Sequence, residues 1–90
     1  MRLPQNNELD YLGADNQFST YDLGLATALI SVGFELWGLD KNNAKKVLFI
    51  FKQSPEIIKV GNDYWADKLE INARTLFDNQ KMLKNRIYSA

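Results

Sequence analysis

Two short segments of the 90-residue sequence gather side chains that could neutralise phosphate groups. Lys41, Lys45 and Lys46 lie within six positions of one another, and Lys81 and Lys84 lie in a second basic stretch. Clustered basic side chains bind nucleic acids by displacing counterions from the phosphate backbone, without reading the bases. We therefore expect these five lysines to mediate sequence-independent association with nucleic acid.

The charge of the chain is unevenly distributed, although its formal net charge is zero. Residues 1–40 carry one basic and six acidic side chains, whereas residues 41–90 carry ten basic and five acidic ones. The concentration of lysines in the second half also has a purely structural interpretation. In that interpretation the lysines protect a sheet edge and a turn from aggregation, and the acidic N-terminal segment folds back onto them.

A second set of residues supports a different kind of binding. Trp37, Leu39, Tyr64 and Trp65 are large apolar residues whose side chains could meet a protein partner or a second copy of the chain if they are partly exposed. A protein-interaction or homodimerising module is therefore the alternative to a nucleic-acid-binding one.

The residue types exclude most catalytic chemistry. The chain has no Cys and no His, and its five glycines are too scattered to form a phosphate-binding loop. Ser19 and Ser54 suit helix caps better than nucleophiles, and Asp63 and Asp67 suit a solvated helix end better than a metal site. We expect a non-enzymatic protein without cofactor or metal.

The elements that position these residues begin with a capping-box pattern. Ser19 followed by Asp22 predicts that a helix starts at Ser19, because each side chain can bond to the other's backbone N–H. Apolar residues cover nearly the whole circumference of this helix up to residue 32, so it should be the core helix, and Gly33 should end it. Residues 1–17 are polar and unperiodic, which predicts a flexible arm.

An antiparallel hairpin is expected after the first helix. Residues 34–40 alternate between two faces, as in a strand, and the Asn-rich segment that follows has turn chemistry. Residues 47–51 are apolar without a break, so this second strand should be central in the sheet. Phe49, Phe51 and Trp37 are expected to belong to the core.

Two further helices complete the predicted fold. Ser54 and Pro55 should start a helix that reaches about Trp65, and Asn72 should cap the last helix. A short strand at residues 69–71 would extend the hairpin to three strands. The predicted inner stripe of the last helix is Ala73, Leu76, Phe77, Gln80, Leu83, Lys84 and Ile87. The fold class is α+β, a hairpin covered by three helices in the order α-β-β-α-(β)-α, with residues 18–90 as a single domain.

Several of these patterns together resemble a known family. They are the segment Phe-Ser-Thr-Tyr-Asp-Leu-Gly-Leu-Ala at residues 18–26, the Gly33-Phe34 break, the aromatic strand at 47–51, Ser54-Pro55-Glu56, Tyr64-Trp65, and Leu83-Lys84 with Ile87-Tyr88. The chain is similar, over about residues 18–88, to a family of small bacterial and phage proteins described as a domain of unknown function. The resemblance implies a prokaryotic or phage setting and assigns no catalytic or binding residue.

The sequence also bears on the cellular compartment. It contains no apolar run long enough for a signal-peptide core or a transmembrane helix, and the absence of Cys agrees with a reducing environment. We expect no membrane partner and a cytoplasmic location.

Overall fold

A computed structural model describes residues 16–89 and contains three strands and three helices in that range. In chain order these are β1 (Gln17–Thr20), α2 (Leu23–Ser31), β2 (Leu36–Asp40), β3 (Leu48–Lys52), α3 (Pro55–Trp65) and α4 (Ala73–Tyr88). The predicted α+β class is confirmed, with the element order β-α-β-β-α-α. The arm predicted for residues 1–17 lies outside the described residues up to residue 15, and Gln17 already belongs to the sheet.

The three strands form one antiparallel sheet in the order β1-β3-β2, so β3 is central as its apolar sequence predicts. Phe18 pairs with Phe51 on one side of β3, and Leu39 pairs with Phe49 on the other. Phe49 and Phe51 are buried in the core, which confirms that prediction. A register shift between Leu36 and Gly38 interrupts the pairing of β2.

The predicted helix start at Ser19 is wrong, because residues 17–20 form β1. Ser19 and Thr20 lie opposite Ile50 and Phe49 of β3, and both are buried. The helix begins after Asp22 instead, whose carboxylate accepts a hydrogen bond from the Leu25 N–H at 2.8 Å. Sheet pairing with a distant strand therefore overrides the local capping pattern.

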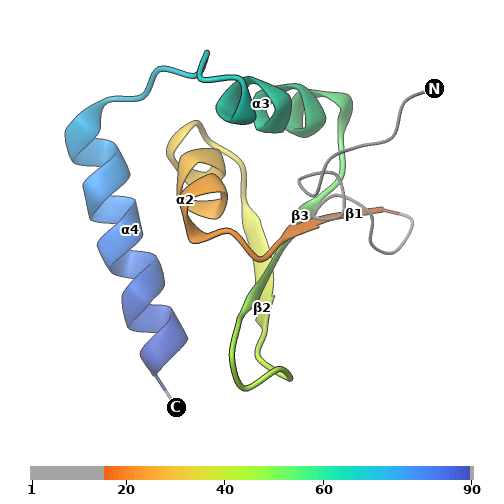
Figure 1. The fold of residues 1–90 in the computed structure, drawn as a ribbon, viewed down its shortest axis with the longest axis vertical. Helices are drawn as coiled ribbons and strands as arrows, with labels where there is room; N and C mark the ends of the chain where they lie inside the picture. Colours follow the sequence, from red (N-terminus) through yellow and green to blue (C-terminus); the bar gives the residue numbers. More distant parts are fainter. Residues whose placement is uncertain (1–15, 90) are drawn as a thin grey trace.

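Helix α2 is the centre of the molecule, as its apolar circumference predicts. It lies between the sheet and the other two helices (Figure 1), and five consecutive residues, Leu25 to Leu29, are buried. The core around it contains Phe18, Leu25, Ala26, Leu29, Phe49, Phe51, Ile57 and Leu83.

Helices α2 and α3 end in the same hydrogen-bond pattern. After α2, the N–H groups of Gly33 and Phe34 donate to the carbonyls of Ile30 and Leu29. After α3, Asp67 and Lys68 donate to Tyr64 and Asp63 in the same way. This is the Schellman motif, which needs one residue with positive φ just beyond the helix. Gly33 has φ of 113°, as expected of glycine, whereas Asp67 is a non-glycine residue with φ of 62°.

The predicted starts of the last two helices are confirmed. Ser54 caps α3 by accepting the Ile57 N–H at 3.1 Å, with Pro55 in the first helical turn. Asn72 caps α4 by accepting the N–H groups of Arg74 and Thr75.

Three other expectations are wrong. Residues 69–71 form no strand: the third strand of the sheet is β1, and this segment instead links α3 to α4. Trp37 is 46% exposed rather than part of the core, since it lies on the opposite side of β2 from the core contacts of Leu36. Phe77 is 64% exposed because α4 turns Leu76 and Leu83 inward.

None of the described helices has the length and apolar character needed to cross a membrane.

Candidate functional site

The turn between β2 and β3 is fastened to the end of α4 by Lys41. The Lys41 Nζ donates hydrogen bonds to the backbone carbonyls of Arg86 at 3.0 Å and of Ser89 at 3.1 Å. The last carbonyls of a helix have no partner within the helix, and they lie at the negative end of its dipole, so a cation there is stabilising. One of the predicted site residues therefore joins two segments that are more than 40 positions apart.

The other two lysines of the turn are exposed. The Lys46 Nζ lies 4.2 Å from the centre of the Tyr21 ring, which is a cation–π contact. Asn43 shapes the turn by accepting the Lys45 N–H through its side chain at 2.7 Å, as its turn chemistry predicts. The turn thus projects Lys45 and Lys46 into solvent beside an aromatic ring.

The solvent side of α4 carries two lysines flanked by two aromatic rings. Phe77, Lys81, Lys84 and Tyr88 follow one another at intervals of four, three and four residues, which places them along one stripe of the helix. All four are exposed, Phe77 to 64% and Tyr88 to 82%. The predicted inner stripe is therefore correct for Leu83 and wrong for Lys84 and Phe77.

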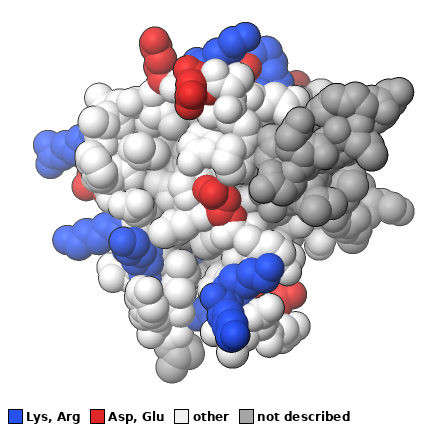
Figure 2. Space-filling view, in the orientation of Figure 1, with Lys and Arg blue, Asp and Glu red and all other residues white. Residues whose placement is uncertain are grey.

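We call the combined surface the turn–helix surface: Lys41, Lys45, Lys46, Phe77, Lys81, Lys84, Arg86 and Tyr88. Figure 2 shows basic side chains over α4 and over the turn on one face of the molecule. The sequence holds no Asp or Glu at 41–55 or at 79–90, so no acidic neighbour in these segments offsets the positive charge. All five lysines predicted from the sequence belong to this surface, whereas its aromatic members were missed, although the spacing of Phe77, Lys81, Lys84 and Tyr88 contained the signal.

The alternative set of predicted site residues does not form one surface. Trp37 and Leu39 lie on β2, whereas Tyr64 and Trp65 lie at the end of α3, on the other side of the molecule (Figure 1). Leu39 is half-buried against the core, and the Tyr64 and Trp65 rings meet edge to face at 5.1 Å. Only the two tryptophans offer substantial exposed area, at two separate places.

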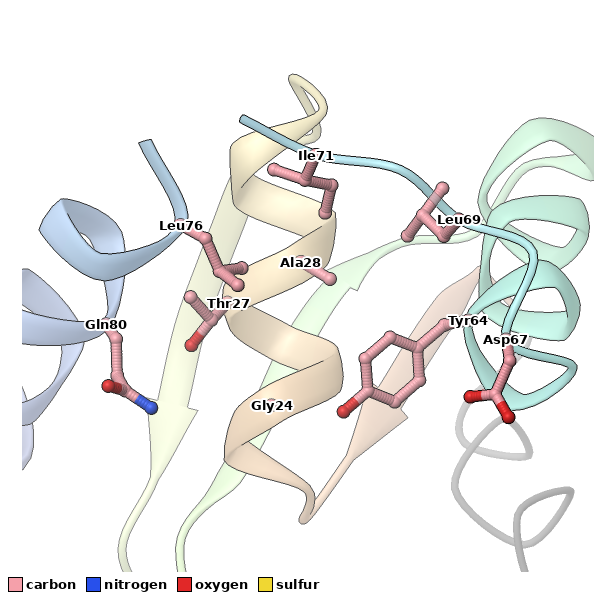
Figure 3. A pocket seen from close by; sticks show the side chains of 9 residues that line it. All are labelled: Gly24, Thr27, Ala28, Tyr64, Asp67, Leu69, Ile71, Leu76 and Gln80. Carbon is pink, nitrogen blue, oxygen red and sulfur yellow. The ribbon is translucent and has the colours of Figure 1, made fainter. Parts of the chain in front are cut away.

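A pocket of about 360 Å³ opens between α2, α3, α4 and the segment that links the last two helices. It is lined by Gly24, Thr27, Ala28, Tyr64, Asp67, Leu69, Ile71, Leu76 and Gln80 (Figure 3). The Tyr64 hydroxyl points toward Gly24, and a Cβ at residue 24 would overlap it. Glycine at this position is what allows the ring to approach α2 so closely.

The environment of the pocket is negative around Tyr64. Burial, followed by the charges of Asp22 and Asp67, raises the pKa of the Tyr64 hydroxyl above its ordinary value of 10.0. The phenol is therefore neutral at physiological pH and able both to donate and to accept a hydrogen bond.

The acidic residues of this region do not assemble a metal site. Asp63, one of the two carboxylates considered from the sequence, pairs with Lys59 at 2.9 Å along α3. Across the residues that the structure describes, no three acidic side chains come close enough together to hold a metal ion.

Comparison with known proteins identifies a family. No curated protein and no solved structure gives a significant match to the chain. The model of the family described as "Domain of unknown function (DUF5659)" matches residues 15–89, which include every described strand and helix. Because this match spans most of the chain, the protein belongs to that family.

Proposed function

We propose that this domain is a non-enzymatic binding module that associates with nucleic acid through the turn–helix surface, independently of base sequence. The observation that carries the proposal is the pair of hydrogen bonds from Lys41 to the end of α4. They bring Lys41 of the turn to the end of the helix that carries Lys81 and Lys84, which supports treating the two basic segments as one surface.

The composition of the surface favours a single strand over a duplex. A single strand exposes both its phosphates and the faces of its bases, and base stacking on an aromatic ring is worth about 1–3 kcal/mol per base. Phe77 and Tyr88 flank Lys81 and Lys84 along one stripe of α4, so each lysine has a ring one helical turn away. A duplex hides the base faces and could use only the lysines.

The test is the salt dependence of oligonucleotide binding. Fluorescence anisotropy of labelled single-stranded and double-stranded oligonucleotides would be followed from about 50 mM salt upward, where electrostatic binding is strongest. Replacing Lys45, Lys46 and Lys84 by Gln should lower the slope of log affinity against log salt by about two for single strands and about three for duplexes. Lys41 stays unchanged because it also holds α4.

A matched variant controls for the loss of three charges. Lys52, Lys59 and Lys68 lie outside the turn–helix surface and are exposed, so their replacement by Gln should leave the slope nearly unchanged. If neither the single-stranded nor the double-stranded oligonucleotide binds at tens of micromolar protein, or if the control variant lowers the slope equally, the proposal is refuted.

A protein-interaction or homodimerising module is the second candidate, and the exposure of Phe77 and Tyr88 favours it. Aromatic side chains often provide most of the binding energy at protein interfaces. An apolar contact of this kind persists or strengthens in salt, whereas phosphate binding weakens. A dimer in size-exclusion chromatography at high salt that Phe77→Ala converts to a monomer would support this candidate.

The proposal places the domain in the cytoplasm of a bacterium or a phage-infected cell. The family resemblance implies that setting, and the Cys-free composition suits a reducing compartment. Localisation of the tagged protein in a bacterial host, with recovery of bound nucleic acid, would test it.

A further inference from the structure

The pocket between the helices is separate from the turn–helix surface and has a chemistry of its own. Its lining comes from α2, α3, α4 and the link between α3 and α4, and it includes none of the lysines or arginines of the chain. Its volume of about 360 Å³ falls within the range of small-molecule sites.

Three polar side chains reach the pocket from three different segments. They are the Tyr64 hydroxyl from α3, the Asp67 carboxylate from the link, and the Gln80 amide from α4 (Figure 3). Within the described part of the chain, none of these three side chains forms a hydrogen bond with another protein group. Polar groups that converge on a partly enclosed space without protein partners are available to orient a ligand.

The remaining walls are largely apolar. Leu69 and Ile71 come from the link, Leu76 from α4 and Ala28 from the buried side of α2. The link between α3 and α4, residues 66–72, passes directly over α2 (Figure 3). Leu69 and Ile71 therefore reach the pocket although the link forms no strand. An apolar part of a ligand can therefore be covered while its polar end faces Tyr64 and Asp67.

The negative charge around Tyr64 determines which charge the polar group of a ligand can carry. Asp67 lines the pocket, and the Asp22 carboxylate lies beside Gly24, with one oxygen 3.1 Å from the position that a Cβ there would take. The Asp22 carboxylate accepts the Leu25 N–H at the start of α2, and among the described residues it forms no ion pair. A carboxylate or phosphate would be repelled here, whereas an ammonium group would gain charge-assisted hydrogen bonds.

We propose that this pocket binds a small organic cation, a primary amine with an apolar body, with its ammonium group at Asp67 and Tyr64 and its apolar part against Leu69, Ile71 and Leu76. Asp67 provides the charge, the neutral Tyr64 hydroxyl accepts a hydrogen bond, and Gly24 leaves the space in which the ring reaches the site. The proposal is independent of nucleic-acid binding.

The test compares three probes of nearly equal shape: 2-phenylethylamine, 2-phenylethanol and 3-phenylpropionate. Each is titrated into the full chain labelled with ¹⁵N, and backbone amide shifts are followed by NMR. The amine should shift the amides of Gly24, Asp67 and Gln80 in a saturable way, the alcohol should bind at least about tenfold more weakly, and the carboxylate should not bind.

Variants then assign the effect to Asp67. Asp67→Asn removes the charge and keeps a residue that tolerates positive φ, so the fold is retained while amine affinity falls at least about tenfold. Asp78→Asn removes an equal charge from the exposed side of α4 and should leave the affinity unchanged. Equal binding of the amine and the alcohol, no saturable shifts at millimolar amine, or unchanged affinity in Asp67→Asn would each overturn the proposal.

Discussion

The two sides of α2 differ in how completely their neighbours fill the space against them. The side toward the sheet is apolar and closed, with Leu25 and Leu29 against Phe18, Phe49 and Phe51, all buried. The side toward α3 and α4 carries the small residues Gly24, Thr27 and Ala28 and leaves a pocket. The Thr27 hydroxyl bonds to the carbonyl of Leu23 rather than to a neighbouring helix. Both sides contribute to the core, since Ile57 of α3 and Leu83 of α4 are also buried, but only the side toward α3 and α4 keeps space and polar groups for a ligand.

The largest effect should come from the closed side. Phe49→Ala removes a buried ring from the central strand and should lower the free energy of unfolding by about 3–5 kcal/mol. Phe77→Ala removes the same side chain from the exposed stripe of α4 and should change it by less than about 0.5 kcal/mol. Urea denaturation of both variants measures the contrast, and similar midpoints would mean that the sheet side is not the core.

The next effect should come from the open side, where Gly24→Ala forces the Tyr64 hydroxyl to move. We expect a net loss of about 1–2 kcal/mol, because overpacking outweighs the small gain in helix propensity. In a Tyr64→Phe background the nearer obstructing oxygen is gone and the Asp22 Oδ1 remains 3.1 Å from the added Cβ, so Gly24→Ala should cost less than it does beside Tyr64. Gly38→Ala is the matched control, since no atom lies within 4 Å of its added Cβ and the change should not destabilise the fold. Thermal melts of the four variants would reveal whether this side tolerates filling.

A smaller effect distinguishes the two helix ends. Asp67→Gly should raise the free energy of unfolding by about 0.5–1 kcal/mol by relieving positive φ, whereas Gly33→Asp should lower it by a similar amount. Denaturant midpoints should therefore move in opposite directions. A loss of stability in Asp67→Gly would indicate that the carboxylate serves the fold rather than the pocket.

The smallest effect concerns pH. The pKa of Tyr64 is raised on folding, so the unfolded chain releases this proton at lower pH than the folded chain does. Stability from this residue is complete below about pH 10, the unfolded pKa, and falls as the pH rises toward the folded value. Tyr64→Phe should remove part of the alkaline decline in melting temperature, and an identical decline in both proteins would contradict the assignment.

Local signals in the sequence predicted the features that depend on neighbouring residues. Ser54 and Asn72 cap their helices as expected, and Gly33 takes the positive φ that its position requires. β1 was missed because its pairing partner lies some 30 residues away, and a capping pattern gives no indication of such a partner.

The site was predictable in part for the same reason. The five lysines could be identified from their clustering, but the contact of Lys41 with the end of α4 depends on tertiary structure. Phe77 adjoins Leu76, and periodicity alone cannot decide which of two adjacent apolar residues a helix turns outward. The pocket could not be predicted, since Gly24, Asp67 and Gln80 come from three segments that meet only in the folded chain.

The strand order has a consequence for how the domain is made in the cell. Among the described strands β1 is synthesised before the other two, but within the described residues it pairs only with β3, and the core is incomplete until Leu83 of α4 is present. At about 5–20 residues per second, a ribosome needs about 3–13 s to pass from Phe18 to Leu83. During that time the nascent chain exposes the apolar residues of β1 and α2 without their partners. The domain can therefore complete its core only after α4 has been synthesised. A chain interrupted before α4 would be a substrate for chaperones and proteases.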